Sequence, residues 1–246
     1  MRILINGACG RMGRALRAMI EQGCQGATLA GMVDAFGQEE GVLHQLSDFT
    51  GEADCIIDFS NHAATGALTE LAAARKLPLV IATTGQTPEE LELVDEAAKT
   101  VPVFLSGNMS LGIALLTQLS RMAARMFPDA DIEIVESHHN QKLDVPSGTA
   151  LMLGRAVQEA RPESFLLVGR HENGKRTKEE IGIHSLRMGN TVGIHEVIVN
   201  TGTQIITLKH EAQDRSLFAE GALSAAAFLV QQAPGLYNMN DIVNQA

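Results

Sequence analysis

Short apolar runs alternate with amphipathic stretches through the first half of the chain. The apolar runs are typical of strands because they are brief, rich in Ile, Leu and Val, and bounded by turn residues. They lie at residues 2–6, 28–34, 53–60, 77–85 and 101–108. Helices are predicted after three of them; the second is capped by Ser60, and the third begins at Pro88 after a Thr87 cap. This alternation predicts an α/β fold with a Rossmann-type, doubly wound parallel sheet.

The second half of the chain has a different rhythm. A long helix is predicted at about 110–127, a strand at 131–137, and a second helix from Ser147 to about Ala160. Four strand-like runs follow, separated by Gly and Asn turns in the pattern of a meander. They lie at 165–171, 181–188, 193–200 and 203–210, and an alanine-rich helical stretch begins at Ser216.

We expect this last stretch to rejoin the first domain. The predicted organisation is therefore one domain at 1–109 and 216–246 and a second domain at 110–215. The second domain is predicted to be α+β, with a mixed open sheet.

Composition and charge exclude several classes of function. The chain of 246 residues is 45% hydrophobic, enough for a proper core, and its net charge of −10 gives no footprint for nucleic acid. No Lys/Arg run indicates a membrane surface, and the first residues lack an export signal. The three cysteines, Cys9, Cys24 and Cys55, have no C-x-x-C spacing, so neither a disulfide frame nor a zinc site is expected. A small-molecule function in the cytoplasm, without a metal, fits these observations.

A glycine-rich loop follows the first strand. Gly7, Gly10 and Gly13 would supply a tight turn, a close approach to a pyrophosphate and a helix N-terminus facing the anion. The spacing G-x-x-G-x-x-G departs from the usual dinucleotide fingerprint, and alone it is equally compatible with a structural turn. Asp34 ends the second strand, where a carboxylate can accept hydrogen bonds from ribose hydroxyls. Together these features favour dinucleotide binding over the alternative that Asp34 is only a turn residue.

The residue after Asp34 is Ala35, which supplies no positive charge. A carboxylate at this position also repels a 2′-phosphate, so NADH is expected to be preferred to NADPH or used equally well. Arg11 and Arg14 lie in the glycine loop and helix start, from where they could reach the phosphate and restore NADPH binding.

Short polar loops close three further strands, at 58–60, 82–85 and 106–110. Ligands of open α/β sheets bind at the carboxyl ends of the strands, so these loops are expected to line the nicotinamide half of the site. As isolated tripeptides they are common turns, and their weight comes from their shared position. The candidates are Phe59, Ser60, Ala82, Thr83, Thr84, Ser106, Gly107, Asn108 and Met109.

Residues 136–150 bring together the candidate chemistry of the second domain. His138, His139 and Lys142 follow a predicted strand, and Ser147 then caps a helix whose first N–H groups, at Gly148 and Thr149, can face an anion. A pair of histidines alone is more often a surface feature. An imidazole and an ammonium near a carboxylate clamp suit the protonation of a small acid. Metal binding is disfavoured because adjacent histidines point apart and no acidic residue has ligand spacing.

The stretch EIVESHHNQKLDVPSGTA closely resembles the signature of the dihydrodipicolinate reductase family. The resemblance extends over nearly the whole chain, through GACGRMGR, DFS, ATTG, SGNMSLG, GNTVGIHEV, LKHEAQDRSLFAEGA and GLYNMNDIV. It implies NAD(P)H-dependent reduction of 4-hydroxy-tetrahydrodipicolinate, a cyclic imine dicarboxylate, to tetrahydrodipicolinate in the diaminopimelate route of lysine biosynthesis. It also implies a homotetramer built through the β-rich domain, and a hinge that closes around the substrate.

The same resemblance implies roles for individual residues. His138 would donate the proton with Lys142 as its partner, His139 would contact the substrate, and the start of the helix at Ser147, Gly148 and Thr149 would hold a carboxylate. The cofactor would bind Gly7, Ala8, Cys9, Gly10, Arg11, Met12, Asp34, the turn at Ala82, Thr83 and Thr84, and the turn at Ser106, Gly107, Asn108 and Met109. Ala82 stands where the family often has Gly, and Met109 where it often has Phe. Ala35 replaces an arginine found in some members, which leaves NADPH preference in doubt.

Two other hypotheses remain open from the residues themselves. A dehydrogenase acting on another imino or oxo acid would keep the glycine loop and Asp34 without needing the whole His-Lys-Ser-Gly-Thr group. A dinucleotide-sensing protein would bind NADH without turnover. The remaining histidines are expected to be structural or solvated: His44, His62, His171, His184, His195 and His210.

Overall fold

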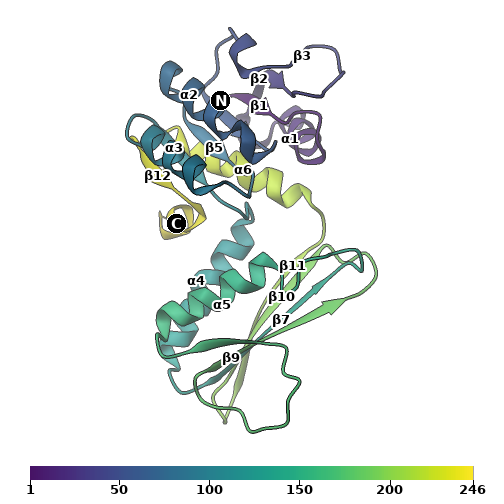
Figure 1. The fold of residues 1–246 in the computed structure, drawn as a ribbon, viewed down its shortest axis with the longest axis vertical. Coiled ribbons are helices and arrows are strands. Elements are labelled where there is room, and N and C mark those ends of the chain that lie inside the picture. Colours follow the sequence, from purple (N-terminus) through teal and green to yellow (C-terminus); the bar gives the residue numbers. More distant parts are fainter. Residues whose placement is uncertain (246) are drawn as a thin grey trace. The chain divides into compact units, whose positions relative to one another are not determined.

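A computed structural model describes residues 1–245, which form two compact units (Figure 1). Unit 1 comprises Met1–Ser110 together with the chain from Arg215 onward, and unit 2 comprises Leu111–Asp214. No helix within residues 1–245 is both long and apolar enough to cross a membrane.

Unit 1 is a parallel sheet of seven strands in the order β12-β6-β5-β4-β1-β2-β3. The strands are β1 (Arg2–Asn6), β2 (Thr28–Val33), β3 (Val42–Leu43), β4 (Cys55–Asp58), β5 (Leu79–Ile81), β6 (Pro102–Leu105) and β12 (Gly235–Tyr237). Since β1 is followed by β2 on one side and by β4 on the other, the order reverses at the centre of the sheet. The predicted doubly wound fold is confirmed, and a ligand site is expected at this switch point.

Helices cover both faces of this sheet (Figure 1). They are α1 (Arg11–Glu21), α2 (Thr65–Arg75), α3 (Pro88–Ala98), α6 (Ser216–Leu229) and α7 (Met239–Gln245), with short 3₁₀ turns at Cys24–Gly26, Leu46–Asp48 and His62–Ala64. The capping box at Thr87 and Glu90 is present as predicted. The predicted cap at Ser60 is wrong: Asn61 caps the turn that precedes α2, because the Ser60 hydroxyl is bonded to Asp58 instead.

Helix α6 returns the chain to unit 1 and packs against α1 and strands β4, β5 and β6. At Gly221 the helix lies so close to the chain that an added Cβ would lie 1.6 Å from the carbonyl oxygen of Met109. Only a residue without a side chain fits there. The helix thereby braces the loop that follows β6.

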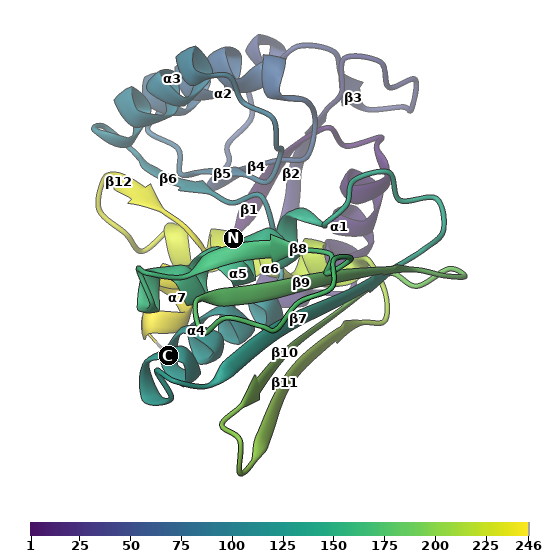
Figure 2. The ribbon, with the colours of Figure 1, turned by 60° about the horizontal axis from the view of Figure 1, so that its bottom comes forward.

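Unit 2 is a mixed sheet of five strands in the order β11-β10-β7-β9-β8 (Figure 2). The strands are β7 (Asp131–His138), β8 (Phe165–Val168), β9 (Glu180–Arg187), β10 (Gly193–Asn200) and β11 (Ile205–Ala212), and the helices are α4 (Leu111–Met126) and α5 (Gly148–Ala160). The mixed sheet was predicted correctly, but the meander is wrong. Strand β7 lies between β9 and β10, and only β10 and β11 form a hairpin. The long segment 169–179 carries the chain back, so that β9 runs parallel to β8.

Helices α4 and α5 cover one face of this sheet, and Ile132 and Ile134 of β7 belong to the core between them. Side chains two residues apart on a strand share a face. The core face of β7 therefore continues from Ile134 to Glu136 and His138, both of which are buried. Polar residues thus occupy the end of a face that begins as hydrophobic core.

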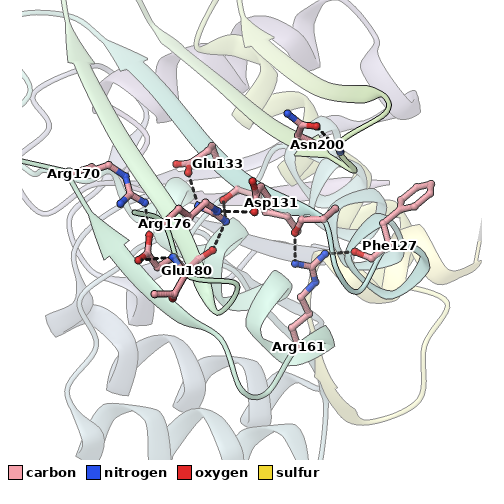
Figure 3. A network of polar contacts seen from close by, with 12 residues as sticks. Phe127, Asp131, Glu133, Arg161, Arg170, Arg176, Glu180 and Asn200 are labelled. Atoms are coloured by element: carbon pink, nitrogen blue, oxygen red, sulfur yellow. Dashed lines mark hydrogen bonds and ion pairs between the residues drawn. The ribbon is translucent and has the colours of Figure 1, made fainter. Parts of the chain in front are cut away.

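Arginines tie the segment 169–179 and the start of β7 to their surroundings (Figure 3). Arg176 pairs with Asp131 at 2.8 Å and with Glu133 at 2.5 Å, and it also bonds the backbone carbonyl of Glu180. Arg161, just after α5, donates to the carbonyl of Ala130 at 2.7 Å, and also bonds nearby carbonyls at the end of α4. These contacts hold the connections around β7 in place.

Candidate active site

The glycine loop of unit 1 is a tight backbone turn that has no room for a side chain at Gly7 or Gly13. Gly7 has a φ of +79°, and a Cβ there would lie 2.7 Å from the carbonyl oxygen of Phe59. A Cβ on Gly13 would lie 2.1 Å from the carbonyl oxygen of Gly7. Helix α1 then begins after Gly10 without a side-chain cap, so its first N–H groups suit an anionic ligand. The loop therefore fits a pyrophosphate.

Asp34 fastens this loop from the end of β2. One carboxylate oxygen accepts from the N–H of Cys9 at 2.9 Å, and the other accepts from the N–H of Phe36 at 3.1 Å. Carboxylate oxygens have further lone pairs, so these bonds are compatible with a ribose as well. A hollow of about 560 Å³ adjoins Asp34, and its lining includes Cys9, Gly10, Arg14, Phe36 and Glu39.

A second, mostly apolar cavity of about 560 Å³ lies in unit 1 beyond β2 and beside α2. Ala35, Leu46, Ala64, Ala67 and Leu71 are among its lining residues. Its size is in the range of small-molecule pockets, and an apolar slot of this kind suits the flat adenine ring of a dinucleotide. The glycine cradle, Asp34 and this cavity together fit a nicotinamide dinucleotide.

A buried carboxylate organises the carboxyl edge of the sheet in unit 1. Asp58 accepts hydrogen bonds from Asn6 at 2.8 Å, from the Ser60 hydroxyl at 2.5 Å and from the Thr83 hydroxyl at 2.6 Å. Burial raises the pKa of Asp58, against the effect of those bonds. The network joins the loops after β1, β4 and β5. Ser60 and Thr83 were both predicted to contact the cofactor. Their hydroxyl groups donate to Asp58 within this network.

The loop after β6 is held by its own side chains. The Ser106 hydroxyl donates to the carbonyl of Asn108 at 2.8 Å, and Met109 is buried against α6. The structure thus brings the predicted loops to one edge of the sheet. It places Met109 in the packing of that edge.

In unit 2, His138 belongs to a buried network around Glu136, whose side chain is 0% exposed. His138 Nδ1 lies 2.5 Å from Oε2 of Glu136. Arg187, at the end of β9, donates to both carboxylate oxygens, at 2.8 and 2.9 Å. The backbone N–H of Ser147 donates to Oε1 at 3.2 Å. The carboxylate is therefore fully hydrogen-bonded although no water reaches it.

These contacts move the pKa values of the two groups. Burial alone would raise the pKa of Glu136, but the bonds from Arg187, Ser185, His138 and Ser147 outweigh it and bring it to about 2. Burial lowers the pKa of His138; Glu136 opposes this, while the charges of Lys142 and Arg187 add to it. At neutral pH, Glu136 is an anion and the neutral form of His138 is favoured.

A second histidine, His195 on β10, packs edge-on against His138 with ring centroids 5.1 Å apart. Its Nε2 lies 3.1 Å from the Ser147 hydroxyl, which also accepts from the N–H of Ala150 and so caps α5 as predicted. Burial, followed by the charge of His138, lowers the pKa of His195 to about 4. His195 therefore holds the capping serine as a neutral ring.

The remaining predicted residues lie around this network. Lys142 pairs with Asp144 at 2.8 Å, and its charge is felt by His138. His139 is half-buried, while Gly148 is exposed and a Cβ there would meet no atom within 4 Å. The helix start is therefore open on this side. Among residues 1–245 no group of His, Cys, Asp and Glu is arranged to hold a metal ion.

Several residues of these networks were not among the predicted site residues, including Glu136, Arg187 and His195, and Asp58 within the predicted loop 58–60. A signal existed for Glu136, because the alternation along β7 places it on the same face as the apolar Ile134. A carboxylate on a core face needs partners. Arg187 and His195 could not be found in this way, because their contacts with residues 136–147 depend on strand pairings that a meander does not contain.

Comparison with known proteins gives a consistent result. The family description "Dihydrodipicolinate reductase, N-terminus" matches residues 1–109, and "Dihydrodipicolinate reductase, C-terminus" matches residues 112–243. A 4-hydroxy-tetrahydrodipicolinate reductase of Caldanaerobacter subterraneus subsp. tengcongensis is 45% identical over 100% of this chain and 99% of its own length. One of Clostridium novyi is 38% identical over 98% of each chain.

A solved structure is similar over the same extent. The dipicolinate-bound dihydrodipicolinate reductase from Paenisporosarcina sp. TG-14 matches with a TM-score of 0.81 and 25% identity, covering 98% of this chain and 99% of that one. The diaminopimelate dehydrogenase of C. glutamicum, at 14% identity and a TM-score of 0.58, shares the fold.

Proposed function

Because the chain belongs to the dihydrodipicolinate reductase family, and its reaction is the NAD(P)H-dependent reduction of 4-hydroxy-tetrahydrodipicolinate on the diaminopimelate route to lysine, we propose that His138 and Lys142 protonate the substrate as one unit. Loss of the 4-hydroxyl group as water leaves a conjugated imine, to which a bound nicotinamide would supply the hydride. Electron density then moves toward the ring nitrogen of the substrate, and a cation placed there stabilises it and donates a proton.

The observation that carries this proposal is the convergence of groups within residues 136–149 of unit 2. A buried imidazole, the ammonium of Lys142 and the open N-terminus of α5 belong to one short stretch on one sheet and helix. The first N–H groups of α5, at Gly148 and Thr149, would bind a substrate carboxylate, and Ser147 would fix the helix start. His139 would contact the substrate. The relative bound to dipicolinate, a planar dicarboxylate, supports a ligand of this shape.

Unit 1 would hold the cofactor. The glycine loop would bind the pyrophosphate, Asp34 the adenosine ribose, and the loops after β4, β5 and β6 the nicotinamide half. The residues concerned are those of the glycine loop, Gly7, Ala8, Cys9, Gly10, Arg11 and Met12, with Asp34, Phe59, Ser60, Ala82, Thr83, Thr84, Ser106, Gly107, Asn108 and Met109. Residues 1–109 and 216–246 thus form the dinucleotide-binding domain of the proposal, and 110–215 the domain for substrate and oligomerisation.

NADH would be used at least as well as NADPH. Asp34 favours free ribose hydroxyls, and Arg14, which could pair with a 2′-phosphate, is bonded to Glu39 at 2.9 Å. Arg17 bonds the same carboxylate at 2.6 Å, so this edge of the site carries little free positive charge. Steady-state kcat/KM with both cofactors is the test. A preference for NADPH above about tenfold, or ~1.4 kcal/mol, would contradict the proposal and indicate Arg11 or Arg14.

We also propose a homotetramer formed through unit 2. Its edge strands carry exposed apolar side chains, including Ile205 on β11 and Phe165 and Val168 on β8. Exposed edges and apolar side chains of this kind are commonly covered by another subunit. Sedimentation equilibrium at micromolar concentration tests the proposal, and a monomer would contradict it.

Replacement of His138 or Lys142 by glutamine tests the proposed chemistry. Each variant should lower kcat by roughly 10² or more, the usual range for a general acid, while NADH binding stays nearly unchanged. The double variant should lose less than the product of the two single losses, because the residues act together. Thr149→Val should raise KM more than it lowers kcat. Stopped-flow turnover with NADH titration separates these results, and near-normal kcat in both single variants would show that the proton comes from elsewhere.

A further inference from the structure

We infer that Glu136, itself held by Arg187, is a positioning residue that orients His138, so that Nε2 is the ring atom that exchanges a proton with the substrate. This inference rests on the proposed function, since it assigns a task to the histidine proposed as the acid. It adds two residues of the buried network, Glu136 and Arg187, to the machinery of the reaction.

The hydrogen bonds around Glu136 leave its carboxylate one arrangement. Oε1 accepts from Arg187 at 2.8 Å and from the Ser147 N–H at 3.2 Å, and Oε2 accepts from Arg187 at 2.9 Å. Oε2 also contacts His138 Nδ1, at 2.5 Å, and the Ser185 side chain bonds the same carboxylate. An ionised carboxylate only accepts, so Nδ1 must carry the hydrogen. The ring is thereby fixed in one tautomer and one orientation, as in other carboxylate-histidine pairs.

The opposite edge of the ring faces a residue without a side chain. A Cβ on Gly193 of β10 would lie 3.1 Å from His138 Nε2, closer than most such contacts. Glycine at this position therefore leaves space next to Nε2. The ring has its Nδ1 edge bonded to protein and its Nε2 edge beside an uncrowded strand end.

Charged and titratable groups approach the ring from several elements. Those that act on it directly are Glu136 of β7, Arg187 of β9, Lys142 of the following loop and His195 of β10. Behind these, Asp144 pairs with Lys142, and His210 of β11 lies opposite His195. Helix α5 contributes the Ser147 cap.

Glu136 is the carboxylate in contact with the ring within residues 1–245, and it stabilises the imidazolium against burial and two cations. Loss of its charge should lower the pKa of His138 further. Loss of Arg187 should raise it, because a cation then no longer opposes the proton. Loss of Glu136 and loss of Arg187 are thus expected to shift the pKa of His138 in opposite directions. A nonspecific destabilisation of the structure would not do this.

Glu136→Gln is the central variant, and Glu133→Gln is its matched control on the same strand. Glu133 also bonds an arginine and a histidine, but on the face of the sheet away from α4 and α5. We expect Glu136→Gln to lower kcat/KM by roughly 10- to 100-fold at pH 7.5, with NADH affinity unchanged. The fall of kcat/KM at high pH should also move to lower pH by about one unit. Glu133→Gln should change neither, and sedimentation confirms that both variants assemble alike.

Arg187→Gln should move the same fall of kcat/KM to higher pH. Should that variant not fold, the histidine ¹⁵N spectrum of the wild-type protein decides. The signal missing in His138→Gln assigns the ring, and at high pH its proton should be on Nδ1. A proton on Nε2, or equal behaviour of Glu136→Gln and Glu133→Gln, would overturn the inference. If His138→Gln itself keeps a normal kcat, the proposed function fails; if it is impaired while the two glutamate variants match, only the inference fails.

Discussion

Strand β7 carries two glutamates, three residues apart, and each is bonded to one arginine and one histidine. Glu136 pairs with Arg187 and His138, and Glu133 pairs with Arg176 and His184. An odd separation places them on opposite faces of the sheet. Glu136 lies on the face covered by α4 and α5, with its side chain 0% exposed, whereas the side chain of Glu133 is 30% exposed.

This comparison shows that burial determines how tightly a group of one glutamate, one arginine and one histidine holds its members in position. Glu133 reaches water, so its pairs need not satisfy the whole carboxylate, and they fasten the segment 169–179 to β7 (Figure 3). Glu136 has no water and must be satisfied by protein groups alone, which fixes the position of every partner. His138 is thereby held in a way that His184, itself partly exposed, is not.

The largest expected effect is on stability, from Arg187→Met compared with Arg176→Met. Arg187→Met leaves a buried carboxylate without its cation, which costs about 3–5 kcal/mol. Arg176→Met should cost about 1 kcal/mol, because Glu133 keeps access to water and to His184. Urea unfolding of both variants measures the difference. Equal losses would show that the two faces of β7 do not differ in the way described.

Acidification should weaken the face of the sheet that contains the buried His195. The folded-state pKa of His195, about 4, is below the usual 6.5, so unfolding takes up a proton between these values. The stability from this group is present above pH 6.5 and lost as the pH falls toward 4, on the order of 3 kcal/mol. His195→Gln should remove this part of the pH dependence. Unfolding free energies measured every half unit of pH would show whether it does.

A double-mutant cycle should show coupling on one face only. In the His138→Gln background the histidine is already gone, so adding Glu136→Gln should change kcat by less than about twofold. In the wild-type background the same substitution is expected to act strongly. Glu133→Gln and His184→Gln should leave kcat near normal, singly and together. Independent, multiplying losses at Glu136 and His138 would argue against their acting through one proton.

Alanine substitutions at two glycines should give the smallest effects. They should also separate a loss of turnover from a loss of stability. Gly193→Ala would crowd His138 Nε2, and we expect kcat to fall roughly three- to tenfold with little loss of stability. Gly182→Ala would place a Cβ 1.7 Å from the Glu133 carboxylate, so it should lower stability by ~1–3 kcal/mol while kcat of the folded protein is kept. Turnover and thermal unfolding of both variants test this. A normal kcat in Gly193→Ala would show that Nε2 is not the functional edge.

The sequence predicted most of unit 1 and the local elements of unit 2, because these depend on neighbours in the chain. Period-two and helical patterns, the Thr87 capping box and the Ser147 cap all lie within a few residues of what they stabilise. Strands β3 and β12 were missed because they have only two and three residues and, unlike the equally short β5, do not lie within a longer apolar run.

The misses in unit 2 depend on pairing between distant strands. The insertion of β7 between β9 and β10 brings Arg187 and His195 to Glu136, and no local pattern contains that information. The Ser60 cap failed for a related reason, since Asp58 competes for the hydroxyl within its own network. Roles at the site followed from the family resemblance, whereas the groups that hold those residues became visible only in the structure.

The close contact between Gly221 and Met109 has a consequence for biosynthesis. A ribosome must make the whole of unit 2 before it makes α6, whose Gly221 meets the carbonyl of Met109. Unit 2 is a continuous segment and can fold as soon as it emerges, but unit 1 must wait for its missing helix with part of its sheet uncovered. In chains stalled just after unit 2 emerges, we therefore expect protease to cut residues 1–110 faster than 111–214. The chain would thus complete unit 2 first and unit 1 last.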